Sequence, residues 1–124
     1  MAPILRVIKL PILCSGGDAT VTQSENHVNG LLVELMYVPV TIATGATVTV
    51  SVQNSDVTKT ILTKANAGTS TLILYPRGSG CDNTGSVGSD GLQLIPVVGM
   101  LRVVVASGVG AGAGTLYATV QEDV

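Results

Sequence analysis

The chain has 124 residues and a formal net charge of −2, with 46% hydrophobic and only 11% charged residues. This length suits one domain with its own core, but soluble domains usually carry roughly 25% charged residues. The six lysine and arginine residues are scattered, so no basic stripe could follow a phosphate backbone, and we expect no direct nucleic-acid binding. Two interpretations remain: a surface rich in Thr, Ser, Asn and Gln, or a surface largely buried against other chains. We favour the second.

Residues 1–14 are apolar, but Pro3, Arg6, Lys9 and Pro11 interrupt the apolar core that a signal peptide requires. We expect this segment to be an extended N-terminal arm or a first strand. Residues 15–124 should form a single β-sandwich domain. No apolar stretch approaches the roughly 20 residues of a membrane-spanning helix, so we expect no membrane contact.

Alternating apolar and polar residues predict strands over most of the chain. In residues 47–52 every second residue is valine and the others are threonine or serine, which is typical of a strand with one buried face. Similar runs predict nine short strands, at residues 4–10, 19–24, 30–38, 47–53, 60–64, 69–75, 92–96, 100–106 and 115–121. This pattern predicts an all-β fold, an antiparallel β-sandwich or a jelly-roll-like or barrel domain.

The segment 28–38 also fits a helix, because Leu31, Leu32, Leu35 and Met36 fall at helical spacing. β-Branched residues and Pro39 at its end favour a strand instead. Two loops stand out. Residues 78–91 are polar and glycine-rich, which suggests a contact loop, and residues 107–114 alternate glycine with small residues and should connect the last two strands. Glycine at position 99 predicts a turn between the strands at 92–96 and 100–106.

The long loop offers weak candidates for a metal site. Asp82, Asn83 and Asp90 could bind calcium, but the spacing of a calcium-binding loop is absent. Cys14 and Cys81 are the two cysteines, too few for a metal site of their own, and we expect both to be thiols. We predict no metal and no cofactor.

Catalytic candidates are equally sparse. His27 is the single histidine and lies in a polar stretch, where a solvated role is more common than a catalytic one. Glu25 and Glu34 could pair as in a glycosidase, yet the three aromatic residues of the chain are too few to line a sugar-binding cleft. We therefore predict no catalytic residue and expect that the protein is not an enzyme.

The candidate interface residues are apolar residues of the N-terminal segment and aromatic or basic residues near apolar strands, because arginine and tyrosine are enriched at protein interfaces. They are Ile4, Leu5, Val7, Ile8, Leu10, Tyr75, Arg77 and Arg102.

Short motifs in a fixed order cover residues 30–121. They are GLLVELMYV (30–38), TGATVTV (44–50), TILT (60–63), YPR (75–77), PVVG (96–99) with LRVVV (101–105), and GTLY (114–117). Their order resembles that of a group of small virion structural proteins of tailed bacteriophages, in which size and β-content are similar to those of capsid decoration or cement proteins.

The resemblance implies a viral structural protein that self-associates, as a homotrimer, and stabilises the phage head by binding the major capsid protein. It implies assembly in the host cytoplasm and a final location on the capsid surface of the virion. Two alternatives stay open: a tail or neck component of the virion, and a small module that binds a host glycan through residues 78–91.

Overall fold

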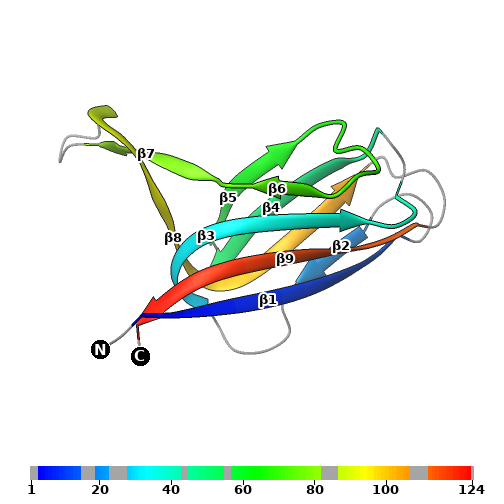
Figure 1. Cartoon of the computed structure of the whole chain (residues 1–124), viewed down its shortest axis with the longest axis horizontal. Coiled ribbons are helices and arrows are strands. Elements are labelled where there is room, and N and C mark those ends of the chain that lie inside the picture. Colours follow the sequence, from blue (N-terminus) through cyan, green and yellow to red (C-terminus); the bar gives the residue numbers. More distant parts are fainter. Residues whose placement is uncertain are drawn as a thin grey trace.

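The computed structural model of the chain describes residues 3–14, 19–22, 28–42, 45–54, 57–81, 87–106 and 112–123. The fold is all-β, and the described residues contain no helix (Figure 1). Its strands are β1 (Pro3–Cys14), β2 (Ala19–Thr22), β3 (Val28–Pro39), β4 (Thr47–Asn54), β5 (Val57–Lys64), β6 (Leu72–Leu74), β7 (Arg77–Cys81), β8 (Val87–Ala106) and β9 (Gly112–Asp123).

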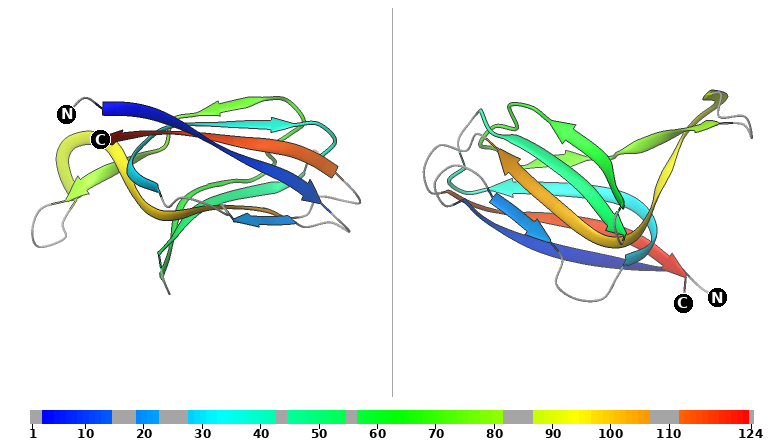
Figure 2. Two further views of the ribbon diagram at one scale, coloured as in Figure 1. Left: turned by 90° about the horizontal axis from the view of Figure 1, so that it is seen from below. Right: turned by 180° about the vertical axis from the view of Figure 1, so that it is seen from behind.

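All pairings between these strands are antiparallel. The strands form one hydrogen-bonded sheet that folds over itself into two layers, as Figure 2 shows in its left view. The first layer has the order β1-β9-β3-β6, and the second has the order β2-β8-β4-β5. A sandwich of this kind buries the inner face of each layer against the other.

Strand β8 joins the two layers. Its middle, Ile95 to Gly99, pairs with β3 of the first layer, and the part that follows pairs with β4 and β2 of the second. The strand bends where it changes layer, at Gly99, whose φ is +130°. Strands commonly change sheets at such bends, and glycine accepts this backbone conformation at little cost.

The first part of β8 pairs with β7, and this hairpin projects from the sandwich (upper left in Figure 1). Pairing runs from Arg77, opposite Leu94, to Cys81, opposite Val87, with a register shift after Ser79. The connection at residues 82–86 lies outside the described residues.

The core lies between the layers and consists mainly of aliphatic residues at alternate strand positions, together with Cys14, Tyr37 and three residues outside the strands, Ile42, Ala46 and Ala67. Its members are Ile8, Leu10, Ile12, Cys14, Val28, Leu32, Leu35, Tyr37, Ile42, Ala46, Val48, Val50, Val52, Ala67, Val97, Leu101, Val103, Val105, Leu116, Ala118 and Val120. The alternation predicted at 47–52 is confirmed for the valines, but Ser51 is buried too. At this point the register of β4 against β5 shifts, with Ile61 as the extra residue of β5.

The predicted fold class is confirmed, and the strand interpretation of 28–38 is correct. Of the two alternatives for residues 1–14, the structure has the first strand: β1 pairs with β9 along its whole length. Three local predictions are wrong. The turn at Gly99 is a bend inside β8, the strand expected at 69–75 is only Leu72–Leu74, and the expected loop at 78–91 contains β7 and the start of β8.

Candidate functional site

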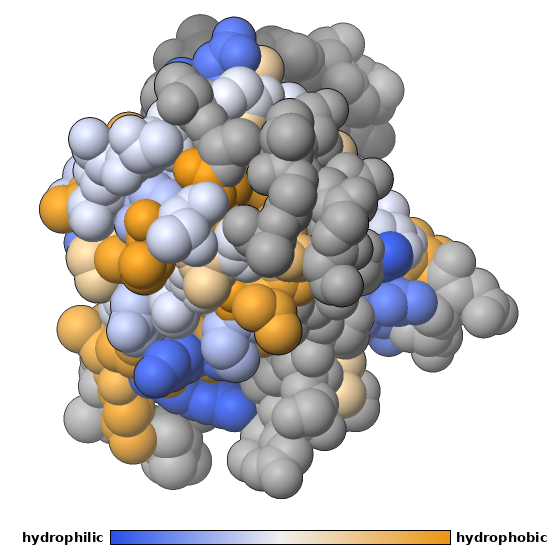
Figure 3. Space-filling model, turned by 90° about the vertical axis from the view of Figure 1, so that its right-hand side faces the viewer, coloured by the Kyte–Doolittle hydropathy of each residue, from blue (hydrophilic) through white to orange (hydrophobic). Residues whose placement is uncertain are grey.

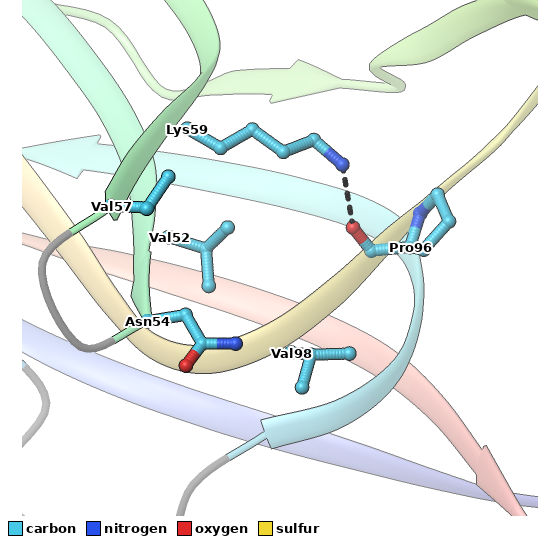
Figure 4. Close-up of a pocket in the computed structure, with 6 residues that line it drawn as sticks. All are labelled: Val52, Asn54, Val57, Lys59, Pro96 and Val98. Carbon is cyan, nitrogen blue, oxygen red and sulfur yellow. Dashed lines mark hydrogen bonds between the residues drawn. The ribbon is translucent and has the colours of Figure 1, made fainter.

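An open groove lies between the β4–β5 hairpin and the middle of β8. It has a volume of about 540 Å³ and is lined by Val52, Asn54, Val57, Lys59, Pro96 and Val98 (Figure 4). The Lys59 Nζ donates a hydrogen bond to the Pro96 carbonyl oxygen at 3.1 Å, so the ammonium group ties β5 to β8 across the groove. Sequence reasoning did not single out these residues, because Lys59 has the pattern of any exposed strand lysine.

The groove offers apolar contact, one ammonium group and one side-chain amide. Among the described residues, the lining contains no carboxylate, imidazole or thiol, so these residues supply neither a carboxylate or imidazole base nor a thiol nucleophile. Such a lining suits an apolar segment that brings an acceptor for Lys59, and it gives no basis for a catalytic reaction.

Arg77 lies at the start of β7 and stabilises the fold locally. Its Nη1 donates to the carbonyl oxygens of Val33 at 3.1 Å and Pro76 at 2.8 Å. Val33 is the residue at which the β3–β9 register shifts, between Leu32 and Glu34, so the guanidinium binds a carbonyl at a β-bulge. The guanidinium also lies 6.0 Å from the ring centroid of Tyr75, which is exposed. Tyr75 therefore remains available to a partner, whereas Arg77 is partly used within the chain.

Two polar side-chain atoms are buried without a hydrogen-bond partner in the described part of the chain: the Tyr37 hydroxyl and the Arg102 Nε. Burial, and to a lesser extent Cys14, raises the pKa of Tyr37 above its usual value. The prediction of a thiol is confirmed for Cys14, which is buried, while the side chain of Cys81 lies outside the described residues.

The outward face of the first layer is rich in exposed apolar side chains. Leu5, Val7 and Leu13 of β1 are 65%, 61% and 72% exposed, and Ile73 of β6 is 53% exposed. Between them lie half-buried residues of β9 and β3, with Thr115, Tyr117 and Thr119 opposite Val38, Met36 and Glu34. Among the residues whose side chains the structure describes, Lys9 and Glu34 are the charged ones that strand alternation places on this face.

Another side of the molecule has a similar composition. In the view of Figure 3, apolar and weakly polar side chains occupy more of the described surface than strongly hydrophilic ones.

The N-terminal interface candidates divide into two groups. Ile4, Leu5 and Val7 are exposed, as an interface requires. Ile8 and Leu10 are core residues, 6% and 2% exposed, and this corrects their prediction as interface residues. The physical reason is the strand alternation: even-numbered β1 residues from position 8 onward point between the layers.

Several sequence candidates fall beyond what the structure describes. Glu25, His27, Asp82 and Asn83 lie outside the described residues, and so does the side chain of Asp90. Glu34 lies on β3, in register with Thr119. Within the described ranges, no three His, Cys, Asp or Glu side chains gather as a metal site would require. No described helix has the length and apolar character needed to cross a membrane.

The sites above therefore stand on geometry alone. Comparison with protein-family models, with curated proteins and with solved structures finds no match for this chain.

Proposed function

We propose that the chain is a structural protein of a tailed-bacteriophage virion, a decoration or cement protein that binds the major capsid protein on the head surface and associates with itself. The sequence resemblance motivates the choice of particle. The structural observation that carries the proposal is the apolar outward face of the first layer.

This face suits attachment to a protein surface. Exposed apolar area removed from water contributes roughly 25 cal/mol per Å² before the costs of association. Leu5, Val7, Leu13 and Ile73 project from the face at both of its edges. Large exposed apolar patches on a chain of this size are typical of interaction sites. Lys9 and Glu34 on this face have opposite signs, so their charges offset each other.

The low charge of the chain supports a role inside an assembly. With 11% charged residues, an isolated monomer has few charges to oppose its self-association. A protein that covers a repeating lattice hides much of this surface against neighbours. The groove beside Lys59 and the paired Arg77 supply no chemistry that would favour an enzyme.

The test is cosedimentation of the purified protein with virus-like heads that lack it. We expect the wild-type protein to pellet with heads, and Ile73→Lys to weaken binding at least tenfold, because it places a charge on the apolar face. The matched control is Thr60→Lys, which places the same charge on an exposed residue of β5 in the other layer, outside the groove lining, and should bind as wild type does. Absence of wild-type binding would overturn the proposal, as would equal effects of the two variants.

A further inference from the structure

The two layers end in four edge strands, and these edges differ in how well they are protected against pairing with another chain. β6 and β2 have only 3 and 4 residues. β5 has 8 residues and carries Lys59 and Lys64. Short length and edge lysines are the usual protection against edge-to-edge pairing. β1 carries Lys9 and two prolines, but it has 12 residues, exposes Leu5, Val7 and Leu13, and among the described strands pairs with β9 alone.

The backbone groups on the open edge of β1 can be identified from its register. The carbonyl oxygen of Ala113 accepts hydrogen bonds from the backbone N–H groups of Val40 at 2.8 Å and Thr41 at 3.0 Å. It therefore faces away from β1, where Ala113 lies opposite Leu13. Ala113 and Leu13 therefore form a non-hydrogen-bonded antiparallel pair, in which both residues direct their N–H and C=O groups away from each other. The backbone groups of Leu13 thus point to the open edge.

The register of β1 against β9 has no shift over residues 3–14. The backbone N–H and C=O groups of successive residues therefore point alternately to β9 and to the open edge along the whole strand. Every odd-numbered residue of β1 points its backbone groups to the open edge. Pro3 and Pro11 are both odd-numbered, and proline, which lacks an N–H, is tolerated where the edge is open. Their positions agree with the direction derived from Ala113.

The prolines limit where a second strand can pair. Between them, Leu5, Val7 and Lys9 each offer an outward N–H and an outward C=O. An antiparallel partner with the same sequence satisfies all of these groups in one register, with Val7 opposite Val7 and Leu5 opposite Lys9. Pro3 then lies opposite Pro11, so the residues that lack an N–H donor face each other at the two ends of the paired segment. A shift by two residues would place a proline opposite Leu5 or Lys9 and leave an acceptor unpaired.

We propose that two copies of the chain associate through the open edges of β1, antiparallel over residues 4–10, about a two-fold axis at Val7. The contact extends the first layer of one copy into that of the other and forms one continuous sheet. A two-fold contact uses the same patch on both copies, and the sequence between Pro3 and Pro11 is complementary to itself in this way.

Side chains and charges fit this register. On the outward face Val7 contacts its counterpart, and Leu5 lies beside the aliphatic stem of Lys9 from the other copy. The two Lys9 residues are four positions apart along the pair, roughly 14 Å at about 3.4 Å per residue, beyond the Debye length of about 8 Å at physiological salt. Arg6 lies 3.5 Å from the Glu122 carboxylate of its own chain, which offsets the repulsion between the two arginines near the axis.

This inference goes beyond the proposed function, because the pairing depends on β1 alone and not on what the assembled protein binds. It predicts an even-numbered assembly, whereas the resemblance to cement proteins implies a trimer. Head binding and dimerisation can therefore fail separately.

The first test is the mass of the full chain in solution by light scattering over a concentration series. We expect a rise from 12.5 kDa towards twice that mass. Val7→Pro removes the central outward N–H while leaving the β1–β9 hydrogen bonds intact, and should weaken dimerisation at least tenfold. The matched control Leu13→Pro also removes an outward N–H from β1, but outside residues 4–10, and should dimerise as wild type does.

A cross-linking test keeps the proposal falsifiable if Val7→Pro does not fold. A hydrogen-bonded antiparallel pair has its Cα atoms about 5.5 Å apart, within the range of about 4.4–6.8 Å for disulfides. In a Cys81→Ser background, Val7→Cys should form a disulfide-linked dimer on mild oxidation, and Leu13→Cys should not. A monomer at all concentrations, or equal cross-linking of the two variants, would overturn the proposal.

Discussion

Gly99 is a position at which a single methyl group should have a large effect on the fold, because backbone strain and steric overlap coincide there. Its φ of +130° is a conformation that residues with a Cβ rarely adopt, and such strain costs on the order of 1–3 kcal/mol. A Cβ at this position would also overlap the carbonyl oxygen of Gln53 and lie 3.1 Å from its carbonyl carbon. To relieve the overlap, the end of β4 must move away from β8. This movement breaks one backbone hydrogen bond between the two strands, at a cost of about 1 kcal/mol.

We therefore expect Gly99→Ala to lower the free energy of unfolding by about 3 kcal/mol, a large part of the roughly 5–15 kcal/mol typical of a domain. With an m-value of about 2 kcal/mol/M, the urea midpoint should fall by about 1.5 M. Equilibrium urea unfolding, followed by far-ultraviolet circular dichroism, measures this shift.

Two other glycines separate backbone strain from steric overlap. Gly68 has φ +82° and open space around it, so Gly68→Ala should cost only the strain, about 1 kcal/mol. At Gly45 the nearest atom to an added Cβ is 4.0 Å away, and Gly45→Ala should be neutral or stabilise by a few tenths of a kcal/mol. If Gly99→Ala costs no more than Gly68→Ala, the overlap with Gln53 is not limiting and the reasoning is refuted.

Two further predictions concern buried or paired polar groups. Tyr37→Phe removes a buried hydroxyl without a hydrogen-bond partner in the described chain, so it should leave stability at pH 7 unchanged or raise it by up to about 1 kcal/mol. Because burial raises the pKa of Tyr37 in the folded chain, the unfolded chain loses this proton first, and wild-type stability should fall above about pH 10. In urea unfolding, the free energy of unfolding of Tyr37→Phe relative to wild type should be higher at about pH 11 than at pH 7. The same difference between the two proteins at both pH values would contradict the raised pKa of Tyr37. Arg77→Ala should lower the free energy of unfolding by about 1–3 kcal/mol, because it leaves the Val33 carbonyl at the bulge without its charged donor. Amide hydrogen exchange should become faster in β7 than in β9. An equal increase of exchange in both strands would argue against a local role of Arg77.

Much of the fold follows from residue alternation alone. Period-two runs located most of the strands, and β-branched residues with Pro39 correctly outweighed the helical spacing of Leu31, Leu32 and Leu35. These signals are local, because each strand's pattern reflects its own buried face. They say nothing about pairing order, which depends on contacts between distant segments.

The errors arise where local signals have two meanings. Glycine at position 99 fits a turn and fits a bend inside a strand that changes layers, and only the partner strands β3 and β4 distinguish the two. The hairpin of β7 and β8 was missed because glycine and serine disfavour strands, and pairing between the two segments outweighs this propensity.

The candidate surfaces were predictable in part. An apolar N-terminal strand correctly indicated Leu5 and Val7 as exposed, but not that Ile8 and Leu10 face the core, because the side of a strand that is buried depends on the rest of the sheet. The groove beside Lys59 had no sequence signal, since its lining comes from β4, β5 and β8.

The alternation of β1 couples the two proposed contacts. Odd-numbered residues direct their side chains to the outward face and their backbone groups to the open edge, so Leu5, Val7 and Lys9 belong to both surfaces. A side-chain substitution at Val7 would therefore disturb both, which is why the face is tested at Ile73 on the far edge of the layer and the edge is tested by removing a backbone donor. Sites this far apart should act independently. Loss of head binding in Ile73→Lys with dimerisation intact would show that the first layer serves two separate contacts.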